Sequence, residues 1–184
     1  MAHFKELAVL RKALQETDER REVVIRQSRE ILRVSKQMIY SLHRGEKDSA
    51  LMAELQEKVR QLPSEFHDAN IQHEALQEYA EAMCFFELLA TGNLPTTKDL
   101  EVDADAYLLG LCDLTGELLR YGINGVAHGD AERLFWAKGI VEEIYGEFLK
   151  FDLRNGDLRR KVDSVKYNLK KLEEVAADIQ LRKK

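Results

Sequence analysis

Four acidic residues interrupt two otherwise apolar helical stretches of the sequence. Glu78 and Glu81 are three residues apart, while Asp113 and Glu117 are four apart, so each pair shares one face of a helix. Residues at this spacing have Cβ atoms about 5 to 6 Å apart, so unpaired carboxylates there repel each other. Burying an ionised carboxylate without a partner costs several kcal/mol. The four acids therefore need protons, basic partners or a bound cation.

Carboxylates without His or Cys suit the hard cations Mg²⁺ and Mn²⁺, which take oxygen ligands. Such an ion activates water and neutralises charge on a phosphate, so the pattern favours hydrolysis of a phosphodiester. The alternative from spacing alone is that the acids are ion-paired or partly exposed helix charges. Other chemistries lack their motifs, because the sequence has no GxxxxGK, GxSxG, GxGxxG or HExxH and no Glu three residues before a His.

A row of basic residues follows one face of the first predicted helix. Arg26, Arg29, Arg33 and Lys36 recur at helical spacing, and Tyr40 lies one turn further on. We expect this stripe to face away from the apolar face and to contact a nucleic-acid backbone, of RNA or of single-stranded DNA. The alternative is an ordinary solvated helix face, since Glu30 is close enough for intrahelical pairs.

The elements that must position these residues are helices. The 184 residues include only 2 Pro and 10 Gly, and 45% hydrophobic residues can bury one sizeable core. We predict an all-α fold, one domain over residues 1–184, as a bundle of six to seven helices with a long N-terminal helix. The long helices are expected at about 2–43, 48–62, 63–90, 107–123, 130–148 and 157–179, with Asp130 capping the fifth.

The first helix, at about 60 Å, is longer than a compact monomer of this size needs. We therefore expect part of it to pack on another subunit, and the last helix carries apolar heptad positions that suit the same use. The net charge of -5 argues against a protein that coats polyanions with its whole surface. Cys84 and Cys112 form no CxxC, and neither a secretory signal nor a membrane span is apparent, so we expect reduced thiols in the cytoplasm.

Three segments carry a resemblance to a known family: 76–82, 105–130 and 165–175. They include the runs Gln-Glu-Tyr-Ala-Glu-Ala, ending at Ala82, and Asp-Leu-Thr-Gly-Glu-Leu, starting at Asp113. These segments resemble translin and translin-associated factor X, all-helical proteins that together form an RNA-cutting complex. The two acidic runs are similar to the catalytic factor X branch. The resemblance covers about the last 110 residues well, whereas the first 60 agree mainly in helical layout.

The resemblance implies that Glu78, Glu81 and Asp113 bind Mg²⁺ or Mn²⁺, and that Glu117 shares the ion or a water. It implies a metal-dependent endoribonuclease inside a closed, octameric homo-oligomer that holds RNA. The sequence departs from translin in the third helix, where His67 and His73 stand in place of an Arg-rich segment. Two alternatives stay open, a non-catalytic binder of single-stranded RNA or DNA and a purely structural helical oligomer.

Overall fold

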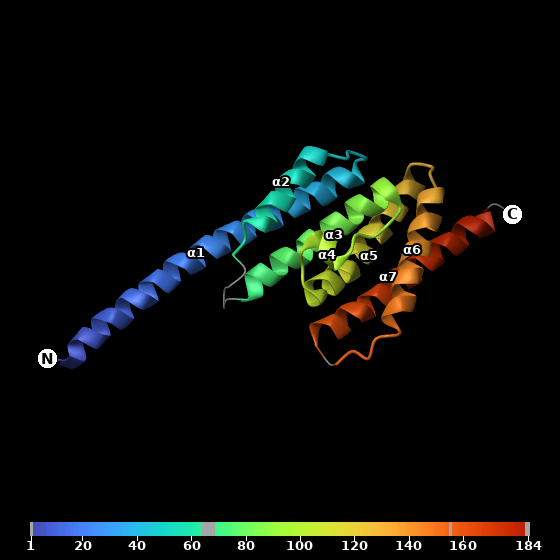
Figure 1. The fold of residues 1–184 in the computed structure, drawn as a ribbon. Coiled ribbons are helices and arrows are strands. Elements are labelled where there is room, and N and C mark those ends of the chain that lie inside the picture. Colours follow the sequence, from blue (N-terminus) through green and yellow to red (C-terminus); the bar gives the residue numbers. More distant parts are fainter. Residues whose placement is uncertain (1, 64–68, 155, 183–184) are drawn as a thin grey trace.

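The fold, taken from a computed structural model, is described for residues 2–63, 69–154 and 156–182, and these residues contain helices but no strand. The predicted all-α class and long N-terminal helix are confirmed (Figure 1). Seven helices occur in this part of the chain: α1 (Ala2–His43), α2 (Ser49–Arg60), α3 (Ala69–Thr91), α4 (Thr97–Leu100), α5 (Ala104–Ala127), α6 (Glu132–Phe148) and α7 (Asp157–Arg182).

The two halves of α1 have different surroundings. Its C-terminal half packs against α2 and α3, and its buried stripe begins at Val24 and includes Ile31, Met38 and Leu42. Its N-terminal half projects beyond the bundle (Figure 1), and residues 4–22 are all exposed. The exposed residues include Phe4, which is 77% accessible, so this half has apolar surface that another chain can cover.

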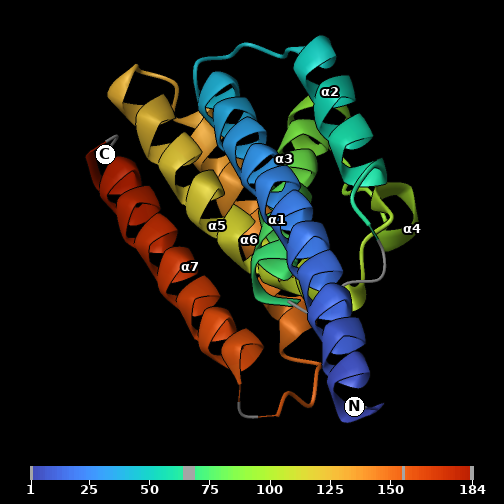
Figure 2. The ribbon, with the colours of Figure 1, turned by 90° about the vertical axis from the view of Figure 1, so that its left-hand side faces the viewer.

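Helix α5 is the centre of the bundle. It packs against α3, α6 and α7, and Figure 2 shows α7 and α1 on either side of it. The helix starts where the Asp103 carboxylate accepts a hydrogen bond from the Ala106 amide at 2.8 Å, satisfying one of the free amides of the first turn. Leu114 and Leu118 are fully buried, which explains why its sequence is apolar on most faces.

Glycine allows α3 and α5 to approach each other closely. A Cβ added at Gly110 would lie 2.8 Å from the Gln77 carbonyl oxygen and 3.0 Å from the Glu81 amide nitrogen. At Gly116, by contrast, an added Cβ would meet nothing nearer than Asn168 Nδ2, at 3.7 Å. Gly110 thus serves helix packing, while Gly116 leaves room beside the acidic residues.

Helix boundaries differ from the predicted ones at several ends, and α5 covers Ala104–Ala127 rather than about 107–123. The start predicted for the third helix lies partly outside the described residues, and the described helix begins at Ala69. Asp130, predicted to cap the fifth long helix, lies one residue before the N-cap position, which is Ala131. Its carboxylate nevertheless accepts a hydrogen bond from the Arg133 amide at 3.4 Å, and it also pairs with the Arg133 guanidinium at 2.8 Å.

Candidate metal and nucleic-acid site

The four predicted acids line one pocket, which we call the acidic pocket. Glu78 and Glu81 come from α3, and Asp113 and Glu117 come from α5. The pocket has a volume of about 490 Å³, and residues of α1 and α7 complete its wall. The structure therefore brings together side chains that are up to 39 positions apart in the sequence, from Glu78 to Glu117.

Glu81 is the most deeply buried of these acids. It is 6% exposed, and no hydrogen bond or ion pair engages its carboxyl group among the described residues. Burial raises the pKa of Glu81 to about 9, and the nearby charges of Asp113, Glu78 and Glu117 add to the rise. In the absence of a cation Glu81 is thus protonated at neutral pH.

The other three acids have basic partners. Lys36 Nζ of α1 lies 3.7 Å from Glu78, and Lys161 Nζ of α7 contacts Asp113. Burial raises the pKa of Glu78, while Lys36 opposes the rise. Each pairing lowers the repulsion inside the pocket.

Glu117 is held by a histidine that the sequence reasoning missed. His43 Nε2, at the end of α1, contacts the Glu117 carboxylate, and Arg120 lies 3.6 Å from the same oxygen. The His43 ring packs against Phe85 and Tyr121, with centroids 5.2 and 6.4 Å away. Its Nδ1 is buried without a hydrogen-bond partner in the described structure, so we place the imidazole proton on Nε2, where it is donated to Glu117.

The sequence carried a signal for His43 but none for Lys161. His43 lies one helical turn after the buried Ile39, so a polar ring there needs a buried partner. Lys161 lies beside the buried Val162 in a helix rich in basic residues, where its charge resembles every other solvated lysine. Only the packing of α7 against α5 reveals its partner.

A hard divalent cation fits the acidic pocket by chemistry, although its ligands have other partners. Carboxylate oxygens are the donors that Mg²⁺ and Mn²⁺ prefer, and the buried Glu81 lacks a counter-charge of its own. As the side chains stand, no three His, Cys, Asp or Glu residues within the described ranges are gathered as a metal site. Binding would require the basic partners of Glu78 and Asp113 to move away.

The predicted basic stripe is exposed along α1, as expected. Not all of its members are in ion pairs. Arg33 pairs with Glu30 at 2.8 Å, whereas Arg26 and Arg29 have no ion pair within the described part of the chain. At its C-terminal end, Lys36 and Tyr40 also line the acidic pocket. The stripe thus leads to the carboxylates. Its members are Arg26, Arg29, Arg33, Lys36 and Tyr40.

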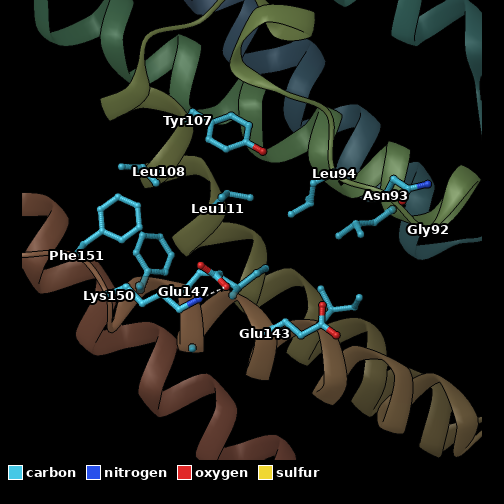
Figure 3. A pocket seen from close by; sticks show the side chains of 15 residues that line it. Gly92, Asn93, Leu94, Tyr107, Leu108, Leu111, Glu143, Glu147, Lys150 and Phe151 are labelled. Carbon is cyan, nitrogen blue, oxygen red and sulfur yellow. Dashed lines mark hydrogen bonds and ion pairs between the residues drawn. The ribbon is translucent and has the colours of Figure 1, made fainter.

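A second, larger pocket lies elsewhere on the molecule, and we call it the apolar pocket. It has a volume of about 800 Å³ between α3, α5 and α6, and none of the nine predicted site residues lines it. Figure 3 shows Tyr107, Leu108 and Leu111 of α5 on its wall and Glu147 turned toward Lys150. These two form an ion pair at 2.6 Å, so their charges compensate each other.

Two further expectations concern the setting of the chain. Cys84 and Cys112 are free and buried, which confirms the predicted core thiols. Within the described ranges, every helix is too short or too polar to span a bilayer.

Comparison with known proteins gives a consistent set of matches. The model of the Translin family matches residues 19–183. Translin of Homo sapiens is 35% identical over 85 residues, which cover 46% of this chain and 37% of that protein. The Translin-associated protein X homolog of Schizosaccharomyces pombe is 33% identical over 130 residues, covering 59% of this chain and 56% of its own length. The chain thus spans little more than a third to about half of these relatives.

Solved structures agree along nearly the whole chain. The crystal structure of apo-NeC3PO has a TM-score of 0.86 and 30% identity, and the match covers 93% of this chain and 95% of that one. AfC3PO in complex with duplex RNA has a TM-score of 0.82 and 26% identity, with 96% of this chain and 97% of that one covered.

Proposed function

The chain belongs to the Translin family, and from that premise we propose that it is a metal-dependent endoribonuclease, which cleaves RNA phosphodiester bonds inside a closed oligomer. Similarity to AfC3PO, which was solved with duplex RNA, supports RNA as the bound polymer, with single-stranded DNA as a second candidate. Similarity to the Translin-associated protein X homolog supports the catalytic branch.

One observation carries the catalytic part of the proposal. Glu81 is 6% exposed and has no counter-charge of its own, although three further carboxylates line the same pocket. A folded protein tolerates such an arrangement only with protons or with a cation in the pocket. If position 81 served packing alone, Leu or Met would make the fold more stable than Glu, because burying a carboxyl group costs desolvation free energy.

Each acid then has a role. Glu78, Glu81 and Asp113 would hold Mg²⁺ or Mn²⁺, which when bound activates a water and neutralises charge on the phosphate. Glu117 orients or deprotonates the attacking water, and its contact with His43 keeps its carboxylate in one orientation. Gly116 leaves the wall between Asp113 and Glu117 open toward the substrate.

RNA would approach along the basic stripe. Arg26 and Arg29 are exposed without ion pairs within the described part of the chain, so their contacts with phosphates need not replace existing ones. Lys36 and Tyr40 line the acidic pocket, so a strand that follows the stripe reaches the carboxylates. Tyr40 is 57% exposed and offers its ring for stacking by a base.

The oligomer that we propose is a closed assembly of identical chains, octameric in size. The apolar residues on the projecting half of α1 support it, because surfaces such as Leu7 and Leu14, 60% and 66% exposed, are costly to leave in water. A cytoplasmic setting is part of the same proposal and is supported by the two free, buried thiols.

A second candidate function is non-catalytic binding of single-stranded RNA or DNA. The observation that favours it is the set of basic partners, since Lys36, Lys161 and His43 engage three of the four acids. In that case the acidic pocket is a structural ion-pair network, and the stripe alone would contact the nucleic acid.

Cleavage of end-labelled RNA separates the two candidates. The purified oligomer is incubated with Mn²⁺ or with EDTA, in parallel with a Glu78→Ala/Glu81→Ala variant, and binding of the same RNA is measured by fluorescence anisotropy. Nuclease activity predicts Mn²⁺-dependent cutting that the variant loses while it still binds RNA. Equal cutting by both proteins rejects the catalytic assignment. Binding without cutting by either protein supports the second candidate.

A further inference from the structure

Two lysines from different helices pair with acids of the acidic pocket. Lys161 of α7 contacts Asp113 of α5, and Lys36 of α1 lies 3.7 Å from Glu78 of α3. Both pairs are partly exposed: the Lys161 and Asp113 side chains are 32% and 30% accessible. Ion pairs with this exposure contribute little to stability. We therefore expect these two pairs to affect the chemistry of the pocket rather than the stability of the fold.

The backbone that carries Lys161 is fixed, while its side chain is not. The neighbouring Val162 and Val165 are buried against the core, which anchors this turn of α7. The lysine itself is a charged head on a flexible four-carbon stem, so it can leave Asp113 without any movement of the helix. Asp113 also accepts a hydrogen bond from Gln77, so the carboxylate keeps an orienting partner when the lysine leaves.

The charges in the pocket require a cation in either state of the site. Without a metal, Glu81 is protonated and the other three carboxylates repel one another, and the lysines compensate two of these. A divalent cation on the same oxygens would make that compensation redundant and would bring two ammonium groups close to an added positive charge. The lysines would then be repelled toward the nearest anion outside, and in a nuclease that anion is the RNA phosphate.

We propose that Lys161 and Lys36 are exchangeable counter-ions: they occupy Asp113 and Glu78 in the metal-free protein and bind the substrate phosphates once the carboxylates hold a divalent cation. This inference rests on the proposed function and adds the regulation of the same site. It explains why the acids line one pocket yet are not gathered as a metal site among the described residues. The lysines compensate Glu78 and Asp113 when no metal is bound and are available for phosphate once a metal is bound.

Three variants of α7 test the exchange, each measured as the metal-free oligomer titrated with Mn²⁺ by calorimetry. Lys161→Met removes the competing charge and should tighten Mn²⁺ binding about fivefold, the loss of a competitor worth about 1 kcal/mol. Lys161→Arg keeps a permanent charge whose planar fork suits Asp113, so it should weaken Mn²⁺ binding. Lys166→Met, an exposed position five residues further along the same helix, should leave Mn²⁺ binding unchanged.

RNA binding supplies the second readout. In saturating Mn²⁺, and with an RNA whose backbone is modified so that it cannot be cut, Lys161→Met should bind about threefold more weakly than the wild type, because a phosphate contact is lost. Tighter metal binding with weaker RNA binding is a combination that a purely structural lysine does not give, since a damaged site weakens both. Weaker or unchanged Mn²⁺ binding by Lys161→Met overturns the exchange.

A double variant, Glu81→Gln/Asp113→Asn, separates this inference from the proposed function. If the wild type and the double variant bind Mn²⁺ equally, or if neither binds it, the assignment of the metal site fails and the exchange fails with it. If the wild type binds Mn²⁺, the double variant does not, and Lys161→Met behaves as the wild type, only the exchange is overturned.

Discussion

The two pockets on α5 differ in what they bury. Positions 107, 108 and 111 line the apolar pocket and positions 113, 116 and 117 line the acidic one, so at 100° per residue they occupy opposite faces of the helix. The apolar pocket is the larger, about 800 against about 490 Å³, and Glu147 and Lys150 at its rim pair with each other. Only the acidic pocket holds a buried carboxyl group without a counter-charge. The larger pocket is therefore not the one whose residues could bind a cation.

The largest expected effect comes from changing one carboxyl group in each pocket. Glu81→Gln should lower Mn²⁺-dependent RNA cleavage by more than about a hundredfold, because an amide cannot replace an anionic ligand. Glu143→Gln, at the edge of the apolar pocket, should leave the rate within about twofold of the wild type. A similar loss in both variants would show that the pockets are not functionally distinct. Initial rates on labelled RNA measure the difference.

Two glycines of α5 provide the next comparison. Gly110→Ala should lower the free energy of unfolding by about 2 kcal/mol, because the added methyl group would lie 2.8 Å from the Gln77 carbonyl oxygen. Gly116→Ala, with 3.7 Å to its nearest neighbour, should raise that free energy by up to about 1 kcal/mol through higher helix propensity. Chemical denaturation at one protein concentration measures both. Equal effects would mean that α3 and α5 are not in the close contact described.

The pH dependence of stability should come from the acidic pocket. Glu81 has a pKa of about 9 in the folded protein against 4.5 as a free side chain, so the folded state holds a proton that the unfolded state has lost. Stability of the metal-free protein should fall as pH rises from about 5 to about 9, by up to about 1 kcal/mol per unit. Glu81→Gln should flatten this profile, whereas Glu143→Gln should not. Denaturation midpoints in EDTA test the slope.

The smallest effects are expected along the basic stripe. Arg29→Ala should weaken RNA binding about threefold and reduce its salt dependence by about one unit of slope. Arg33→Ala should change both by less, because Glu30 already engages this guanidinium at 2.8 Å. Lys150→Ala, at the rim of the apolar pocket, should change neither. An equal loss in all three variants would indicate binding by overall charge rather than by the stripe.

The acidic pocket was predictable from the sequence because its signal is local. Acids three and four residues apart within apolar helices indicate that carboxyl groups are buried. Glu81 is the most deeply buried of the four. Helix boundaries followed from turn residues for the same reason. Asp130 shows the precision of such local rules, since its carboxylate accepts the Arg133 amide of the first turn although the N-cap position is the next residue, Ala131.

The partners of the acids were not predictable, since they depend on how distant helices pack. Lys161 is 48 positions from Asp113, and His43 is 74 positions from Glu117. A lysine in a basic helix carries no mark of the residue it contacts, and a histidine at a helix end indicates a partner without identifying it. The apolar pocket also escaped notice, because apolar residues such as Leu108 resemble core positions in a sequence.

Anomalous scattering from crystals grown without metal and soaked in Mn²⁺ tests whether the carboxylates of the acidic pocket bind a divalent cation. We expect an anomalous peak between α3 and α5, coordinated by Glu78, Glu81 and Asp113, with the Lys161 side chain turned away from Asp113. If Mn²⁺ binds at other positions in the same crystals while the acidic pocket shows no peak and Lys161 still contacts Asp113, the carboxylates do not bind the cation.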